Sequence, residues 1–279
     1  MVKKAADARQ GIQSIEIGFR LLDVLAAATR PMMLRDIAKG AGMPAAKAHR
    51  YMVSFLRIGI VEQDPASSRY DLGAHALLLG QACLRRLDAV QLAGPVLEAL
   101  SEEIQETVAL VVWGSAGPTI VRIVSSGSPV IVTIRYGSVM SLTKSASGRS
   151  FLAFFHSPFL KKLLDEDLRE TAARSKTSVT TLRRQLEKTL ALIREHGISR
   201  STGSLIPGIN GLSAPVYDHT GGMVASITAI GAIGEFDAAW DGAAAKALLA
   251  SATLLSRRLG HNGTMGMPSG APERNRTAT

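Results

Sequence analysis

The stretch from Met33 to Gly59 constrains the fold of this 279-residue chain more than any other part of the sequence. Apolar residues recur at helical spacing at its start, which predicts a short amphipathic helix containing Leu34, Ile37 and Ala38. Gly40 and Gly42 end that helix, because glycine readily adopts the positive φ that a tight turn needs. Pro44 suits the first position of a second helix, where its missing N–H costs nothing.

The second helix is predicted to have an apolar inner face and a basic outer face. Its inner side chains are Ala48, Tyr51, Met52, Phe55 and Leu56. Residues 30–59 carry six basic side chains and one acidic side chain, a net charge of +5. Two helices across a glycine turn, the second with a basic outer face, predict a helix-turn-helix. A helical hairpin with a solvated basic face is the alternative interpretation of this segment alone.

A short β-hairpin is predicted directly after these helices. Residues 60–63 form one strand, residues 64–68 a turn and residues 69–73 the returning strand, an order typical of a winged-helix module. A helix over residues 15–28 precedes the module and should complete a three-helix core. Its predicted buried stripe is Ile15, Phe19, Leu22, Leu25 and Ala26.

The whole chain is basic, with a net charge of +9 and a pI of about 10.0. This charge favours a polyanionic partner, and double-stranded DNA is the partner predicted here. The predicted DNA-binding residues are Arg35, Lys39, Pro44, Ala45, Ala46, Lys47, His49, Arg50, Ser54 and Arg69.

These segments resemble the IclR family of bacterial transcriptional regulators. The resemblance rests on residues 14–22, on the small-Gly-Met-Pro turn ending at Pro44, on the His49-Arg50 pair and on the Arg69-Tyr70-x-Leu72-Gly73 end of the wing. The chain departs from the family at Ala46-Lys47, where Ser-Thr is usual. The resemblance implies a DNA-binding regulator that works as a dimer or tetramer, with repression favoured.

Length and composition predict about two domains with a sizeable core, since apolar residues make up 46% of the 279. Cys83 is the single cysteine, which excludes an internal disulfide and a cysteine-rich zinc site; it is interpreted as a small buried apolar residue. The sequence shows no signal peptide and no apolar run long enough to span a bilayer. A cytoplasmic protein with no membrane partner is therefore expected.

The segment from Ala74 to Arg86 is apolar on most sides and needs burial on more than one of them. The resemblance places a linker helix and dimer contacts here, and a core helix of the second domain is the alternative. The expected division of the chain is a disordered arm (1–10), a winged helix-turn-helix (11–73), a linker helix (74–90), an effector-binding domain (91–260) and a disordered tail (261–279).

The second half is predicted to be an α+β domain with an antiparallel sheet. Its expected strands are 108–113, 120–124, 130–135, 211–217 and 223–230, with a hairpin turn at 218–222; its expected helices are 95–106, one from Ser147, 182–196 and 243–259. Residues 145–153 and 212–218 resemble the GAF-like effector domain of the same family, although Arg149-Ser150 replaces its usual Lys-Ala.

An effector pocket is predicted over one face of this sheet, where strand alternation brings polar side chains together. In members of the family that the chain resembles, the effector lies near the same segments. The predicted residues are Arg135, Gly137, Ser138, Leu142, Thr143, Ser145, Gly211, Ser213, Ser226, Thr228 and Ile230. A small organic effector is expected. A carboxylic acid is one candidate, because Arg135, Lys144 or Arg149 can pair with a carboxylate or can equally be solvated surface charges.

No catalytic motif is complete. Residues 211–215 lack the last glycine of a nucleophile elbow, and residues 203–208 have P-loop glycine spacing without the following Lys and Ser or Thr. The six histidines are scattered without an i, i+4 pair, so neither a metal site nor a cofactor is expected. We therefore predict a DNA-binding regulator and not an enzyme. The rival hypothesis is a ligand-binding sensor whose helix-turn-helix makes protein contacts.

Overall fold

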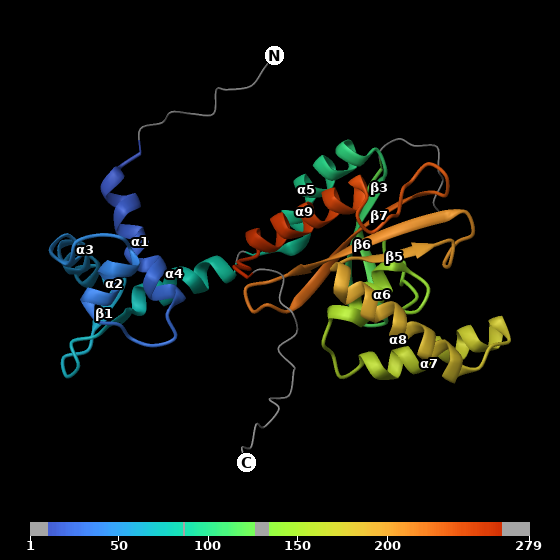
Figure 1. Ribbon diagram of the computed structural model, residues 1–279, viewed down its shortest axis with the longest axis horizontal. Coiled ribbons are helices and arrows are strands. Elements are labelled where there is room, and N and C mark those ends of the chain that lie inside the picture. The colour runs from blue at the N-terminus through green and yellow to red at the C-terminus, as the bar shows by residue number, and fades with distance from the viewer. Residues whose placement is uncertain (1–10, 86, 126–133, 264–279) are drawn as a thin grey trace, which may run out of the picture. The chain divides into compact units, whose positions relative to one another are not determined.

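The computed structural model describes residues 11–85, 87–125 and 134–263, and the chain divides between Leu87 and Asp88 into two compact units. The N-terminal unit consists of α1 (Gln13–Ala27), α2 (Leu34–Gly40), α3 (Ala45–Arg57), the paired strands β1 (Val61–Gln63) and β2 (Tyr70–Leu72), and α4 (Ala74–Leu84) (Figure 1). The predicted helix-turn-helix and wing are therefore both present. None of the described helices is long and apolar enough to cross a membrane.

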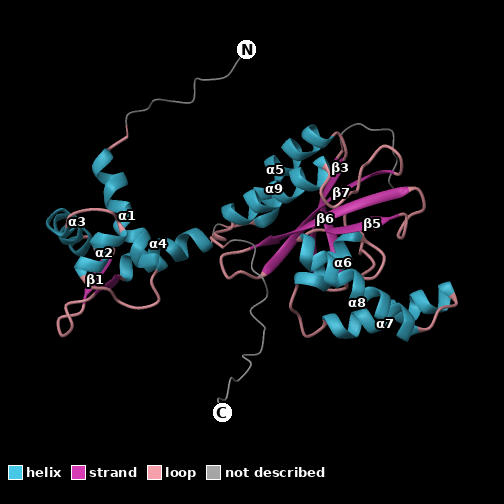
Figure 2. Ribbon diagram, in the orientation of Figure 1, coloured by secondary structure: helices cyan, strands magenta, loops and turns pink. Residues whose placement is uncertain are grey.

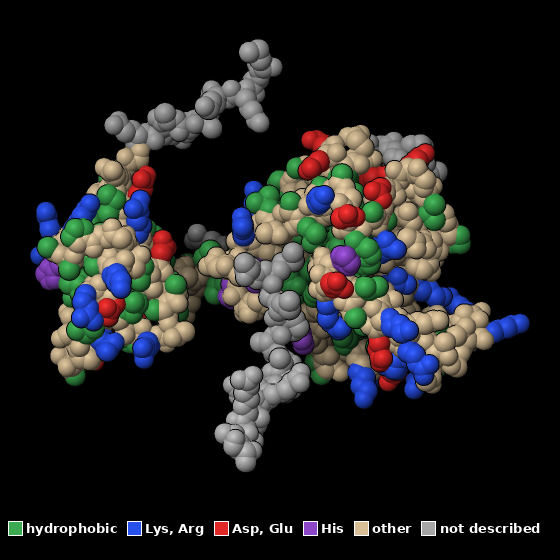
Figure 3. All heavy atoms as spheres, viewed as in Figure 1, with side chains coloured by type: hydrophobic (Ala, Val, Ile, Leu, Met, Phe, Trp, Pro, Cys, Tyr) green, Lys and Arg blue, Asp and Glu red, His purple; other side chains and the backbone are tan. Residues whose placement is uncertain are grey.

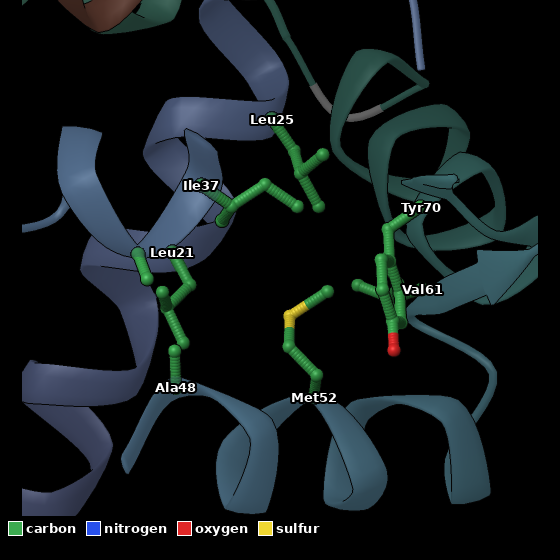
Figure 4. Packing of buried hydrophobic residues seen from close by; sticks show 8 residues of the cluster. Leu21, Leu25, Ile37, Ala48, Met52, Val61 and Tyr70 are labelled. Carbon is green, nitrogen blue, oxygen red and sulfur yellow. The ribbon is translucent and has the colours of Figure 1, made fainter. Parts of the chain in front are cut away.

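The core of the N-terminal unit joins its three first helices to the wing. Met52 of α3 points into the space between α1, α2 and the hairpin, beside Ile37 and Val61 (Figure 4). Leu21 and Leu25 of α1 close this core, and Tyr70 closes it from β2. The basic face of α3 is held outward because Ala48 and Met52 on its opposite side are fully buried.

The buried face of α1 is only partly the predicted one: Leu25 is buried as predicted, whereas Ile15 and Phe19 are not. Ile15 and Phe19 are both 55% exposed, and the fully buried positions are Gly18, Leu21 and Leu25. Two apolar stripes run along this helix, and packing selects the one that contains the glycine. A Cβ at Gly18 would lie 3.1 Å from the rings of Tyr51 and Phe55, so a larger residue would require these rings to shift by a few tenths of an ångström.

The helix α4 is largely exposed: of its residues, Ala76 and Ala82 are half-buried and the others are exposed. Leu77 and Leu78 are 63% and 60% exposed, and none of its described residues is buried. The alternative prediction of a core helix in the second domain is therefore wrong, and Cys83 is an exposed thiol where a buried one was predicted. The helix ends at Leu84, so it is shorter than the expected 74–90, and α5 already begins at Ala89.

The C-terminal unit is a five-stranded antiparallel sheet between two helical layers (Figures 1 and 2). The strands are β3 (Thr107–Gly114), β4 (Gly117–Val124), β5 (Ser199–Thr202), β6 (Ile209–Tyr217) and β7 (Met223–Ala232), in the order β4-β3-β7-β6-β5. Helices α5 (Ala89–Ile104) and α9 (Ala243–Arg258) cover one face. Helix α6 (Ala146–Phe154) covers the other, with α7 (Leu160–Ser175) and α8 (Val179–His196) outside it.

Three elements of this unit differ from the sequence prediction. Helix α5 begins at Ala89 and not at Pro95, because the carboxylate of Asp88 accepts hydrogen bonds from the N–H groups of Val90 and Gln91 and caps the helix. Two further elements, α7 and β5, were not predicted from the sequence. The strand predicted at 130–135 lies largely outside the described residues, and Ile134 and Arg135 belong to no strand.

Glu106, between α5 and β3, is predicted to destabilise the folded protein when its carboxylate is ionised. Burial raises its pKa above the ordinary 4.5, and the negative charge of Glu235 raises it further. An acid with a raised folded-state pKa loses stability as pH rises from its unfolded pKa through its folded pKa. Glu106→Gln should therefore raise the melting temperature at pH 7, and this gain should vanish below the unfolded pKa. Thermal unfolding across pH measures it, with the exposed Glu103→Gln as control; an equal gain at every pH would contradict the assignment.

Candidate DNA-binding surface and effector pocket

The turn between α2 and α3 positions the second helix. Gly42 has a φ of +65°, and the N–H of Met43 donates to the carbonyl of Ala38 at 3.0 Å. Pro44 is the N-cap residue of α3, one position before the predicted place. Its carbonyl accepts hydrogen bonds from the N–H groups of Lys47 and Ala48, both at 3.0 Å, so the proline starts the helix through its acceptor.

The exposed face of α3 carries the predicted basic side chains. Lys47, Arg50 and Ser54 recur at i, i+3 and i+7 and lie opposite the buried Met52. Among the described residues, the side chains of Lys47, His49 and Arg50 have neither an ion-pair partner nor a hydrogen-bond partner. Ala45 and Ala46 precede them and are exposed as well, so phosphates and base edges can approach this face without displacing protein groups.

The remaining predicted cations lie on α2 and the wing. Arg35 forms an exposed ion pair with Asp36 at 3.2 Å, and Lys39 lies exposed in the last turn of α2. Arg69 donates from Nη1 to the carbonyl of Pro31 at 3.2 Å, which fixes the base of the wing. Lys and Arg side chains are spread over the visible face of this unit (Figure 3).

Asp64 orders the tip of the wing. Its carboxylate accepts hydrogen bonds from the hydroxyl and N–H of Ser67 and from the N–H of Ala66. The hydroxyl of Ser67 is the largest cause of the lowered pKa of Asp64, and the N–H of Ala66 lowers it further. The tip is thus held in one shape while Asp64 is ionised.

The C-terminal unit contains a pocket between α6, β6, β7 and the loop that follows β5. Four of the predicted effector residues line it: Ser145, Gly211, Thr228 and Ile230. Strand pairing explains this, because Gly211 lies opposite Ile230 in the register. The hydroxyl of Ser145 caps α6 by accepting from the N–H of Gly148 at 2.8 Å. A Cβ at Gly211 would lie 3.5 Å from that of Ala146, so the first turn of α6 packs closely on the sheet.

Other predicted effector residues lie outside this lining. Ser213 and Ser226 are fully buried on the same strands; Thr228 donates to Ser213 at 2.9 Å, and Ser226 Oγ has no hydrogen-bond partner in the described part of the chain. Arg135, Gly137 and Ser138 belong to a turn between the lining residues Ile134 and Met140 but do not themselves line the pocket. Leu142 belongs to the core cluster beneath α8. The N–H of Thr143 donates to Asp167 at 2.7 Å.

Arg149 is a structural cation. Its guanidinium donates to the carbonyls of Thr143 at 2.8 Å and Arg200 at 3.1 Å and to the hydroxyl of Ser204. Burial lowers the pKa of Arg149. Its donors are used to hold β5 and the following loop against α6, and it does not line the pocket.

Sequence reasoning missed most of the lining. The missed residues are Ile134, Met140, Ala146, Ser147, Ser201, Leu205, Ile206, Ile209 and Asn210. Ser201 and Leu205 come from β5 and its loop, and a four-residue strand gives too short an alternation to recognise.

Comparison with known proteins agrees with this architecture. The IclR helix-turn-helix domain matches residues 14–65, and the bacterial transcriptional regulator IclR C-terminal domain matches residues 81–257. The chain belongs to the IclR family. Its two units therefore correspond to an IclR DNA-binding domain and an IclR effector-binding domain, and the chain is a transcriptional regulator.

Individual members of the IclR family are similar to this chain over most of their own length. The glycerol operon regulatory protein of Streptomyces griseus is 30% identical over 230 residues, 80% of this chain and 86% of that protein. The transcriptional repressor IclR of Escherichia coli is 26% identical, covering 82% and 83%. The crystal structure of Pseudomonas aeruginosa HmgR is 34% identical with a TM-score of 0.80, covering 91% of this chain and all of that one.

Proposed function

We propose that this IclR-family protein is a cytoplasmic repressor that binds a palindromic operator as a dimer or a dimer of dimers, and that it has no catalytic activity. The observation that carries DNA binding is the unpaired basic stripe of Lys47 and Arg50 on α3. Several similar proteins are named as repressors, which favours repression for this chain.

Self-association is supported by α4. Its three consecutive leucines, residues 77–79, are each more than half exposed, and clustered exposed apolar side chains mark interaction surfaces. A two-fold axis would bring the same leucines of two copies together. Such an axis also matches the symmetry of a palindromic operator.

A small organic effector is proposed to bind in the pocket over β6 and β7 and to alter operator affinity. No cofactor is needed for this role. The ligand acts only if it binds one arrangement of the regulator better than another, because equal affinity for both shifts nothing.

A salt titration tests DNA binding against the rival in which the helix-turn-helix contacts protein. Fluorescence anisotropy with a labelled duplex, selected by the protein from a random-sequence pool, should show affinity falling steeply with salt. Each neutralised phosphate contributes a slope of about −0.9 in log K against log salt. A random duplex of equal length is the control. Failure to select any duplex, or salt-insensitive binding, would favour the rival.

A further inference from the structure

The pocket that holds Gly211 and Thr228 is too small for an organic ligand by itself. Its free volume is about 30 Å³. A single water needs on the order of 10–15 Å³ on this scale, whereas ligand pockets span roughly 300–1,000 Å³. We call this cavity the inner chamber. A wall of the inner chamber must therefore move, or the ligand must extend beyond it.

A second cavity lies next to the inner chamber, beneath α7. It has a free volume of about 450 Å³, which is within the range of ligand pockets. We call it the outer chamber. Met140 and Leu205 line both chambers and so form the partition between them. Ile206, the next residue after Leu205, lines the inner chamber alone.

The backbone on the Leu205 side of the partition is a short loop between two glycines. Gly203 and Gly208 have φ values of +63° and +83°, which only glycine adopts readily. The loop is attached to the segment before α6 through Ser204, whose hydroxyl donates to the carbonyl of Lys144 at 3.0 Å. Leu205 thus belongs to an anchored loop and contributes its side chain to both cavities.

The two chambers differ in charge. None of the described residues that line the inner chamber has an ionisable side chain. The outer chamber is lined by Lys144, Glu166, Asp167, Glu170 and Arg174. The carboxylate of Asp167 accepts hydrogen bonds from Ser141 and Thr143, and Glu170 forms an ion pair with Arg174. Within the described chain, the charged groups of the outer chamber that remain without such a partner are Lys144 and Glu166.

We infer that the effector site consists of both chambers and that a ligand reaches the inner chamber from the outer one through the Met140–Leu205 partition. The ligand that fits such a site is an amphipathic small molecule. Its uncharged, mainly apolar end enters the inner chamber, and its polar end stays in the outer chamber. A carboxylate, if the molecule has one, lies beside Lys144 and not in the inner chamber, because burial of a charge without a partner is costly. This inference rests on the proposed role of the pocket as the effector site.

Thiol labelling tests the partition without knowledge of the effector. In the full-length chain, Cys83→Ser removes the single native thiol, and Thr228→Cys places one in the inner chamber. Ser147→Cys is the second position if the first variant folds poorly. Mass spectrometry measures the labelling rates of three reagents: neutral methyl methanethiosulfonate, its sulfonate-bearing analogue and its trimethylammonium-bearing analogue. The neutral reagent should react about tenfold faster or more, since the charged ones must desolvate.

The matched pair Leu205→Ala and Ile206→Ala then locates the entry route. Both remove a similar apolar side chain from the same loop, but only Leu205 belongs to the partition. Leu205→Ala should accelerate neutral labelling about tenfold, and Leu205→Trp should slow it, while Ile206→Ala should have little effect. Equal acceleration by both alanine variants, or equal rates for all three reagents, would overturn the inference. Because no DNA is present, this result is independent of operator binding, which anisotropy measures separately.

Discussion

Lys47→Ala is expected to lower affinity for the selected operator by about 1–3 kcal/mol and to relax the base preference at one position. Lys47 lies in the first turn of α3, two residues after the helix begins, and is exposed opposite the buried core. The N-terminal residues of a recognition helix are the ones that reach base edges in the major groove. The departure from the usual family sequence at Ala46-Lys47 falls at this point, so Lys47 should set part of the operator preference.

Arg50→Ala should give a different pattern. Arg50 lies one turn further along α3, and a phosphate contact there weakens binding to specific and random duplexes alike and lowers the salt slope by about one. Lys162→Ala, an exposed lysine on α7 with the same charge, is the matched control. Anisotropy with both duplexes separates the roles. Equal loss on specific and random DNA for Lys47→Ala would mean that Lys47 contacts phosphate.

Leu78→Asp is expected to raise the dissociation constant of the proposed dimer by a factor on the order of 100 or more. Burying one leucine contributes roughly 1.5–3 kcal/mol, and a two-fold interface loses two copies at once. The aspartate adds a further cost, because a buried charge without a partner is destabilising by several kcal/mol. Leu78 is 60% exposed in the single chain and packs in no described core cluster, so the substitution should leave the fold of each unit intact.

Sedimentation velocity measures this effect over a range of protein concentrations. Leu192→Asp on α8 is the matched control, since Leu192 is 47% exposed and lies outside α4. Circular dichroism of the same samples checks that Leu78→Asp is folded. An intact dimer with folded Leu78→Asp would show that α4 does not form the subunit interface.

Local signals predicted the elements around the DNA-binding face. The positive-φ Gly42, Pro44 two residues later and the apolar spacing of α3 act within a few residues of each other, so the sequence predicts their structure directly. The turn at 218–222 and the helix stop at Gly197 belong to the same class. The residues of α3 that face outward follow from helical periodicity alone, because its apolar stripe is single and strong.

Positions that depend on partners distant in the sequence were the ones predicted wrongly. Helix α1 has two apolar stripes, and only the approach of Tyr51 and Phe55 to Gly18 selects one of them. Cys83 was predicted to be buried because its helix is apolar, whereas its side chain is exposed and α4 has no fully buried residue. The start of α5 is an exception, because its cap is local: Asp88 accepts from the N–H groups of Val90 and Gln91, and the prediction began the helix at Pro95 instead.

The amino-acid sequence alone determined the family, the winged helix-turn-helix and the basic face of α3, since these depend on motifs and short-range periodicity. Only the tertiary structure decided which side chains form the effector pocket. Thr228 and Gly211 were predictable from strand alternation, but Met140, Ser201 and Leu205 reach the same cavity from separate loops and an edge strand. Their meeting is set by strand order and loop packing, which no local pattern in the sequence encodes.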